Sequence, residues 1–571
     1  MASLIPPADV AAILAQLESA PGLARLRELL GPETAFSPEL MAAVLEEAAR
    51  FSDTGLAPFN VVSDRQGCRI EDGRVRTAPG HPELWRDYLA AGWLGIDQPV
   101  EHGGQGLPMA ALAACQEVFE RGSVAFGMLP TSQRAAARLL AAHADEAIQA
   151  EWLPKLVAGD WGATICISEP EAGSDVGRIR TLASPDGDGW RITGEKIWIS
   201  YGDHDLAPRI GHCLLARTPD APPGAQGLSL FLVPDRLDDG GRNGVFVRGI
   251  EEKLGLHGSP TCAMGFEAAQ GRLIGVLNRG LAQLFTMITT MRLMVSVQAL
   301  GVAGAAADVA LAYAEDRRQG GRPDAPAVPI SAHADVQRML LDMTARAEVL
   351  RGLVLAAAVQ ADIARLSPDP GERERAQALT GWLLPIGKTF GGELAQANAS
   401  DAIQVLGGAG YVRDWPAEQL LRDSRVFTIY EGTSGIQALD LLHRRLRRDG
   451  GKGLYAFLDL ARAEVERAED RDAADALDAV LRALADEAGG LAAAAGDAAA
   501  YPFLQLSALA ATGWIALRLV GLGGSDRTSA RLRAAGRRWL HDLPARAALE
   551  QHRIARAEAA LEPFEAIRRT P

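Results

Sequence analysis

The sequence predicts a mainly α-helical protein with a central β domain. Of its 571 residues, 48% are hydrophobic and only 5% are aromatic, and alanine, leucine, arginine and glutamate are abundant. This composition favours long, closely packed helices in a soluble globular protein. From about residue 163 to residue 278 the pattern changes to short apolar runs bounded by glycine, proline and aspartate, which is typical of strands and turns. The clearest of these runs are 190–193, 196–199 and 228–233.

Apolar residues recur at helical spacing before and after the β-rich segment. On the N-terminal side the stripes begin near residues 40, 109 and 145, and glycines at 450–453 predict a hinge near the other end. The predicted helical segments after the β domain are 281–318, 332–366, 372–406 and 415–448, followed by a further bundle broken near Gly489-Gly490. Because the chain is too long for one domain, four are expected: an N-terminal helical domain (1–161), a β domain (162–280), a helical bundle (281–449) and an additional C-terminal helical domain (450–571).

Charge and composition argue against a nucleic-acid-coating, secreted or membrane protein. The net charge is -14, whereas phosphate binding needs a surplus of lysine and arginine. Residues 1–15 lack the basic start and apolar core of a secretory signal, so a cytoplasmic location is expected. The apolar stretches 293–307 and 502–517 are shorter than the roughly 18 residues of a membrane span and predict buried helices. The five cysteines form no CxxC pair, so neither a disulfide framework nor a metal site is expected.

Two polar blocks lie in the β-rich segment. Residues 166–175 (Cys-Ile-Ser-Glu-Pro-Glu-Ala-Gly-Ser-Asp) form a turn whose N–H groups and hydroxyls could hold an anionic or heteroaromatic ligand, although a solvated turn explains the same residues. In the block 194–202, Trp198 and Ser200 share one face of a predicted strand. That arrangement suits a flat ligand, but by itself it suits a protein core better.

Two further blocks lie in the bundle region. The glycines of 404–411 do not have the spacing of a dinucleotide-binding fingerprint and are consistent with the end of a helix. In the block 422–434, Glu431 lies between an apolar run and a Gly-Thr-Ser turn. A carboxylate that faces an apolar pocket has a raised pKa and accepts protons better near neutral pH. An isolated glutamate before glycine is nevertheless more often a surface residue.

Taken together, in this order and at these separations, the four blocks resemble the acyl-CoA dehydrogenase family. The resemblance extends over roughly residues 40–450. It rests chiefly on Ser168-Glu169-Pro170 with Gly173-Ser174-Asp175, and on Tyr430-Glu431-Gly432-Thr433. A fifth block at 251–261 (Glu-Glu-Lys-Leu-Gly-Leu-His-Gly-Ser-Pro-Thr), together with the extra C-terminal bundle, resembles a larger branch of this family.

The resemblance implies that FAD binds between the β domain and the helical bundle. It implies that the 165–174 segment lines the flavin and that the 198–200 segment covers its other side. Arg317 matches a residue that reaches the FAD of a neighbouring subunit, which implies a homodimer or homotetramer. The implied FAD contacts are Ile165, Ile167, Ser168, Ser174, Trp198, Ser200, Arg317, Gln404, Gly407, Gly408, Thr433 and Ser434. The implied substrate contacts are Ser174, Thr289, Arg292 and Gly432.

The implied reaction is α,β-dehydrogenation of an acyl-CoA thioester to a trans-2-enoyl-CoA. Glu431 removes the α-proton while a hydride leaves the β-carbon for flavin N5, and hydrogen bonds to the thioester oxygen stabilise the developing enolate. Reduced FAD then passes its electrons to an electron-transfer flavoprotein. Some members carry their base on an earlier helix, at the position of Met291. That base is absent here, because no acidic residue occurs between Ala268 and Ala307.

Three positions depart from the family pattern. Gly435 stands where smaller members have a glutamine, and Ala334 stands where a FAD-contacting glutamine is common. Thr289 stands where an acidic or amide residue is common. The departures bear on contacts at the adenine end of the cofactor and on contacts to CoA or the acyl chain.

Two other functions compete with the implied one. An acyl-CoA oxidase shares the fold but gives its electrons to oxygen; this chain ends in Arg-Arg-Thr-Pro rather than in a peroxisomal Ser-Lys-Leu. A nucleic-acid-binding flavoprotein of the same fold would use a basic patch, and the arginines between 527 and 538 could supply one. A solvated helix face explains those arginines as well.

Overall fold

The computed structural model describes residues 4–31, 36–493 and 496–568, and the chain divides into two compact units. The first unit contains residues 50–108 and 119–294 and carries every strand found in these ranges. The second unit, which is helical, contains residues 4–49, 109–118 and the chain from 295 onward. Helix α9 (Gly280–Asp316) contributes residues to both units. The division of the chain at 161, 280 and 449 stays a prediction.

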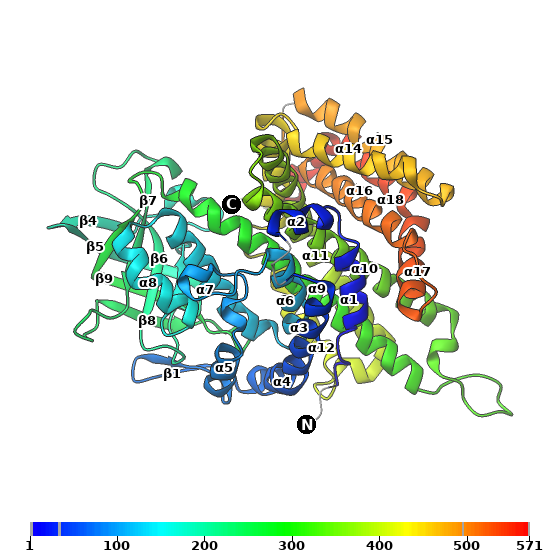
Figure 1. Cartoon of the computed structure of the whole chain (residues 1–571), viewed down its shortest axis with the longest axis horizontal. Coiled ribbons are helices and arrows are strands. Elements are labelled where there is room, and N and C mark those ends of the chain that lie inside the picture. Colours follow the sequence, from blue (N-terminus) through cyan, green and yellow to red (C-terminus); the bar gives the residue numbers. More distant parts are fainter. Residues whose placement is uncertain (1–3, 32–35, 494–495, 569–571) are drawn as a thin grey trace. The chain divides into compact units, whose positions relative to one another are not determined.

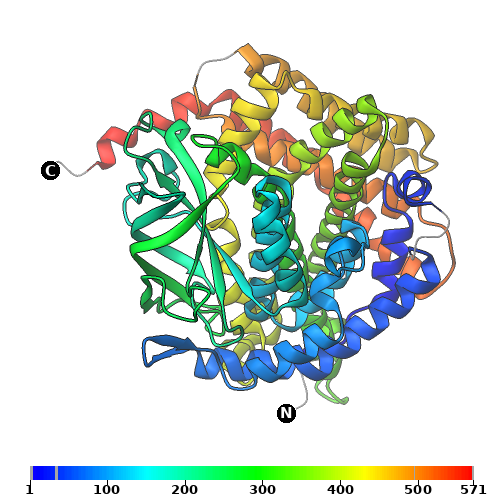
Figure 2. The same cartoon turned by 60° about the vertical axis from the view of Figure 1, so that its left-hand side comes forward.

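A seven-stranded sheet forms the body of the first unit (Figure 1). Its hydrogen-bonded order is β3-β6-β4-β5-β9-β7, with β8 paired to β9, and a pairing of β6 with β7 closes the sheet on itself. Figure 2 shows the strands turned toward the viewer. The strands are β3 (Gly162–Cys166), β4 (Leu182–Asp186), β5 (Gly189–Ser200), β6 (Ile210–Arg217), β7 (Leu228–Pro234), β8 (Val245–Ile250) and β9 (Thr261–Ile274).

Strands β6 and β7 are buried on both faces, which explains why their sequences read as unbroken apolar runs. Leu214 and Phe231 belong to a core enclosed by the sheet. Their neighbours Leu215 and Leu232 belong to a second core, shared with the covering helices. The remaining elements of this unit are α4 (Ala57–Gln66), α5 (His81–Ala90), α7 (Val124–His143), α8 (Glu146–Ala158) and the small hairpin β1 (Arg69–Glu71) and β2 (Arg74–Arg76).

Long antiparallel helices form the second unit. Helices α10 (Ala334–Leu366) and α11 (Pro370–Leu406) pack along each other, and α10 also packs along α16 (Ala500–Val520) and α17 (Arg527–His541). The C-terminal helices and the bundle therefore share one core. The other helices with residues in this unit are α1 (Val10–Glu18), α2 (Leu23–Leu30), α3 (Pro38–Phe51), α6 (Met109–Gly122), α12 (Ala417–Ser424), α13 (Ser434–Leu439), α14 (Lys452–Arg467), α15 (Arg471–Ala493), α18 (Leu543–Ala555), α19 (Ala557–Leu561) and α20 (Phe564–Ile567).

Two predicted boundaries in the helical region are wrong. The segment predicted as helical at 415–448 is two helical stretches, 417–428 and 434–448, because the backbone turns sharply at 429–433. Conversely, the break predicted at Gly489-Gly490 does not occur, since α15 continues to Ala493. Isolated glycines weaken a helix by only about 1 kcal/mol each, and packing of the rest of the helix offsets that cost.

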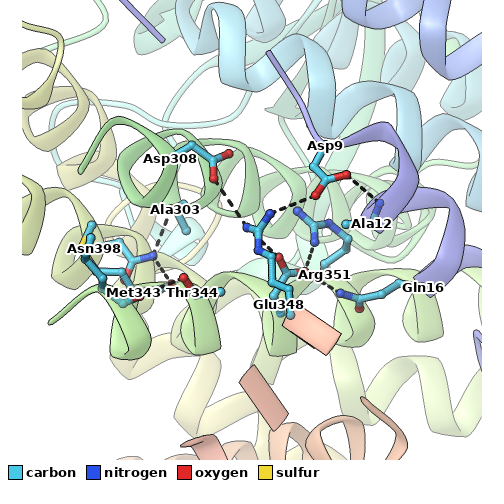
Figure 3. Close-up of polar contacts among 12 residues, drawn as sticks. Asp9, Ala12, Gln16, Ala303, Asp308, Met343, Thr344, Glu348, Arg351 and Asn398 are labelled. Atoms are coloured by element: carbon cyan, nitrogen blue, oxygen red, sulfur yellow. Dashed lines mark hydrogen bonds and ion pairs between the residues drawn. The ribbon is translucent and has the colours of Figure 1, made fainter. Parts of the chain in front are cut away.

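A buried ionic cluster joins five helices of the second unit (Figure 3). Arg351 on α10 donates to Glu117 on α6 at 2.8 Å and pairs with Glu348 on its own helix. Gln16 on α1 donates to Glu348 Oε2, the same oxygen that Arg351 contacts, at 2.7 Å. Arg531 on α17 completes the cluster, with Glu348 at 3.1 Å, Asp9 at 3.0 Å and Asp308 on α9 at 3.5 Å.

Two helices in the described ranges are long and apolar enough to cross a membrane by length and composition, α9 and α16. In each, 94% of the most apolar window is buried inside the protein. This burial confirms the prediction that 293–307 and 502–517 belong to core helices. Four of the five cysteines are also buried, as expected for small core residues.

Candidate active site

The end of β3 and the end of β5 lie together in the first unit, and we call residues 165–168 with 197–200 the sheet-edge site. The N–H of Ile197 donates to the carbonyl of Ser168 at 3.0 Å, and the Thr164 hydroxyl donates to the carbonyl of Ser200 at 3.0 Å. Ile165, Ile167, Ser168 and Ser200 are all half-buried. Five of the predicted cofactor contacts, namely these four residues and Trp198, are therefore brought together.

Trp198 is displayed at the surface of this site rather than packed in the core. Its φ is 62° and its side chain is 59% exposed, at a point where the β5–β9 register shifts between Lys196 and Ile199. A left-handed backbone costs a non-glycine residue about 1–2 kcal/mol. Strain of this kind is retained where it serves a purpose. The expectation that Trp198 is better explained as a core residue is wrong, and its exposed indole offers a flat apolar surface to a ligand.

A buried ion pair holds the two halves of the sheet-edge site together. Lys196 on β5 is fully buried; its Nζ donates to the carbonyl of Ile167 at 3.0 Å and to Glu169 Oε1 at 2.8 Å. Glu169 also accepts from the N–H groups of Arg180 at 2.6 Å and Thr181 at 3.1 Å. Burial alone would raise the pKa of Glu169, but the Lys196 charge and these hydrogen bonds outweigh it and leave the pKa below its ordinary value.

Three predicted contacts in the first unit lie outside the sheet-edge site. Ser174 is exposed on the loop that follows Glu169. Thr289 is exposed on α9, where its hydroxyl donates to the carbonyl of Phe285 at 3.1 Å. Arg292, three residues further along the same helix, is buried.

Glu431 lies on a sharp turn in the second unit, and we call residues 429–433 the Glu431 turn. It joins the short 3-10 helix η8 (Arg425–Thr428) to α13. Both Glu431 and Gly432 adopt left-handed backbone, with φ of 53° and 89°. Thr433 ends the turn by capping α13, since its hydroxyl accepts from the N–H of Ile436 at 3.3 Å. Thr433 is exposed, and Ser434, Gly432 and Glu431 are half-buried.

Two buried side chains hold the carbonyls of the Glu431 turn. Lys388 on α11 donates from Nζ to the carbonyl of Gly432 at 2.6 Å. Gln437 on α13 donates from Nε2 to the carbonyl of Glu431 at 2.9 Å and to that of Gly432 at 3.3 Å. The Tyr430 hydroxyl donates to Gln298 Oε1 on α9. The turn is therefore anchored on both sides of Glu431.

The remaining predicted contacts lie at helix ends of the second unit. Gly407 ends α11 with φ of 63°, and η7 (Gly407–Tyr411) follows it. A side chain at Gly407 or Gly408 would meet nothing within 4 Å, so a ligand could approach the backbone there. Gln404 is exposed on the last turn of α11, and Arg317 is exposed just beyond the end of α9.

Comparison with known proteins assigns these features to one family. Residues 39–160, 164–269 and 278–446 match the N-terminal, middle and C-terminal domains of acyl-CoA dehydrogenases. The chain belongs to the acyl-CoA dehydrogenase family. It is an oxidoreductase and a flavoprotein of fatty acid metabolism by that membership.

Individual relatives extend the match beyond the three domains. The chain is 40% identical over 492 residues to 3-methylmercaptopropionyl-CoA dehydrogenase of Ruegeria pomeroyi, covering 83% of this chain and 84% of that protein. This confirms the larger branch indicated by the 251–261 block and the extra C-terminal bundle. It is 37% identical over 436 residues to the broad-specificity linear acyl-CoA dehydrogenase FadE5 of Mycobacterium tuberculosis, covering 72% and 70%. The structure of Caenorhabditis elegans ACDH-11 in complex with C11-CoA shares the fold, with a TM-score of 0.79, 21% identity and coverage of 96% and 95%.

Sequence reasoning missed the residues that hold these sites in place. The predicted site residues did not include Lys196, Lys388 or Gln437. Each of these side chains donates to a backbone carbonyl of a predicted segment. One signal was available in the sequence. Only five of the 58 basic residues are lysines, so a lysine inside an apolar segment is unusual in this chain.

Proposed function

We propose that this acyl-CoA dehydrogenase oxidises the Cα–Cβ bond of an acyl-CoA thioester with FAD, and that Glu431 is the base for the α-proton. The observation that carries the proposal is the Glu431 turn. A strained, doubly anchored turn around one half-buried carboxylate is a costly arrangement for a surface residue. It is the arrangement expected of a group that must be held in one position.

The residues present fit a flat cofactor with a polar edge. The exposed indole of Trp198 can cover a ring, and Ser168 and Ser200 have hydroxyls that can bond to ring heteroatoms. The open backbone at Gly407 and Gly408 can approach a phosphate or sugar group closely. Ser174, Arg317, Gln404, Thr433 and Ser434 would hold the rest of FAD. When bound, FAD supplies the acceptor for the β-hydride.

The chemistry assigned to the chain is proton abstraction beside a thioester carbonyl. The carboxylate of Glu431 takes the α-proton, and its backbone N–H donates to the thioester oxygen as negative charge develops there. Thr289, Arg292, Gly432 and Ser174 would bind the CoA or acyl part. The substrate class is proposed to include linear and thioether acyl chains, from the substrates that name the two bacterial relatives.

The electron acceptor proposed is an electron-transfer flavoprotein, in a homodimeric or homotetrameric enzyme. Both bacterial relatives are named as dehydrogenases. The rival oxidase function predicts hydrogen peroxide in proportion to substrate consumed. Assaying peroxide beside reduction of an added electron-transfer flavoprotein separates the two, and stoichiometric peroxide would contradict the proposal.

The basic patch required by the nucleic-acid-binding rival is engaged within the protein. Arg531 pairs with Glu348 and two aspartates, and Arg538 pairs with Asp342 at 2.7 Å. Arg533 donates to the carbonyls of Leu522 and Gly524. These three arginines stabilise the helical unit and are not a free phosphate site, whereas Arg527 and Arg537 are exposed on the same helix, as expected for a solvated helix face.

Substitution Glu431→Gln tests the base assignment. We expect kcat for 3-methylmercaptopropionyl-CoA or butyryl-CoA, measured with a dye acceptor, to fall by roughly 10²–10⁴-fold because a general base contributes about that much. Flavin content should stay normal, since the amide preserves size. Glu374→Gln is the matched control, because Glu374 is an exposed partner of Lys452. Near-normal turnover of Glu431→Gln would contradict the assignment of Glu431 as the base.

A further inference from the structure

Three of the five lysines of this chain donate to backbone carbonyls: Lys196 to Ile167, Lys253 to Ser259 at 2.8 Å, and Lys388 to Gly432. Lys196 and Lys388 are 0% exposed. An ammonium is a compact charge on a flexible stem, so it can reach a single carbonyl in a close-packed interior.

Lys388 lies in the most enclosed part of α11. Every residue from Leu379 to Gly392 is buried, and a side chain at the preceding Gly387 would already meet Ser296 Oγ at 3.1 Å. A charge in such a place is costly unless it is bonded. Lys388 Nζ donates to the carbonyl of Gly432, one residue after Glu431, at 2.6 Å.

Gln437 makes the matching contact from the other helix. Its Nε2 spans the two successive carbonyls of Glu431 and Gly432, while its Oε1 is buried with no hydrogen-bond partner among the described residues. The orientation of this amide satisfies the two carbonyls of the Glu431 turn and leaves its own oxygen without a donor among the described residues. Two buried donors from two helices therefore converge on one peptide pair.

We propose that Lys388 and Gln437 are positioning residues that hold Glu431 in its left-handed conformation, an inference that rests on the proposed role of Glu431 as base. With both carbonyls held, the peptide planes on either side of Gly432 cannot rotate. The backbone on the C-terminal side of Glu431, which carries the carboxylate, then keeps one direction. Loss of either donor lets the turn relax toward ordinary φ values and moves the carboxylate away from the α-carbon.

Lys388→Met is the first test, with the exposed Lys452→Met as the matched control. We expect kcat per bound flavin to fall about 100-fold, because a displacement of about 1 Å at a reacting group costs about that much. KM for butyryl-CoA should change less than about threefold. The rate of α-deuterium exchange into the substrate should fall together with kcat, since both need the carboxylate in place.

A purely structural role gives a different pattern. It would lower the thermal midpoint and the fraction of enzyme that carries flavin, but leave kcat per bound flavin and α-exchange unchanged. That result would overturn the inference. This outcome differs from failure of the base assignment. If the assignment fails, Glu431→Gln itself turns over substrate at the normal rate.

Gln437→Met is the second test, and it decides the matter should Lys388→Met not fold. Methionine fills a similar volume and removes an unpartnered buried acceptor, so folding is expected to persist. We expect kcat and α-exchange to fall about 10-fold with Lys388 still in place. Unchanged kcat and α-exchange in a folded, flavin-loaded Gln437→Met would overturn the inference.

Discussion

Gly432 is the residue that makes the Glu431 turn possible. Its φ is 89°, and a Cβ built on it would lie 2.7 Å from Gln437 Nε2, the atom that holds the two carbonyls. An alanine there would bear a left-handed backbone cost of about 1 kcal/mol or more and would displace the Gln437 amide. An alanine at position 432 would therefore change the conformation of the Glu431 turn directly.

Substitution Gly432→Ala should reduce turnover much more than stability. We expect kcat to fall about 10- to 100-fold, because the carboxylate moves with the turn, while flavin content stays within error of wild type. Gly489→Ala on α15 is the control, since a side chain there meets nothing within 4 Å and alanine favours the helix. Equal kcat in Gly432→Ala and wild type would show that the turn tolerates a Cβ.

At the scale of elements, the Lys196–Glu169 pair fastens the loop after β3 to strand β5. The folded pKa of Glu169 lies below its ordinary value, which is about 4.3 in an unfolded chain. A carboxyl with a lowered folded pKa contributes stability that is fully present above the unfolded pKa and is lost as pH falls through the folded pKa. The sheet-edge site should therefore loosen on acidification.

Flavin release on acidification measures this effect. We expect wild-type enzyme to lose flavin as pH falls below about 4.3, the ordinary carboxyl pKa, where Glu169 takes up a proton. Glu169→Gln should hold flavin more weakly at pH 7 and show a flatter profile below pH 5. Glu195→Gln, an exposed change on the same strand, serves as control. Profiles that coincide for Glu169→Gln and wild type would exclude the pair as an anchor.

At the scale of the whole molecule, the C-terminal helices are part of the second unit's core. Arg531 on α17 faces Asp9, Asp308 and the fully buried Glu348, contributed by three other helices. Burial raises the pKa of Glu348, and the charges of Arg351 and Arg531 oppose that rise. Without Arg531, Glu348 and Glu117 would share one arginine, Arg351.

Arg531→Met should therefore destabilise the helical unit by about 3 kcal/mol, the scale for removing one partner of a buried ion pair. The measurement is the guanidinium midpoint followed by far-ultraviolet circular dichroism. Arg527→Met, an exposed change on the same helix, should leave the midpoint unchanged. Unfolding of Arg531→Met at the wild-type guanidinium midpoint would show that Arg531 makes no net contribution to the stability of the helical unit.

Motifs, helical periodicity and strand-like runs were read correctly from the sequence because they depend on neighbours along the chain. The 166–175, 404–411 and 422–434 blocks, the apolar runs at 228–233 and the core helices at 293–307 and 502–517 are of this kind. A Gly-Thr-Ser turn after Glu431 was predicted within a segment otherwise predicted to be helical. The left-handed backbone of Glu431 was not predicted, because it depends on Lys388, 43 residues earlier, and on Gln437.

The amino-acid sequence alone determined the family, the mainly α fold with a central β domain, and the candidate base. Only the tertiary structure decided that Trp198 is displayed rather than packed, that Arg531 and Arg538 of α17 are ion-paired, and that two lysines inside apolar segments hold the backbone of the candidate site. The physical reason is distance along the chain. A buried ammonium and the carbonyl it serves leave no common pattern in sequence, because their pairing depends on where the helices and strands meet.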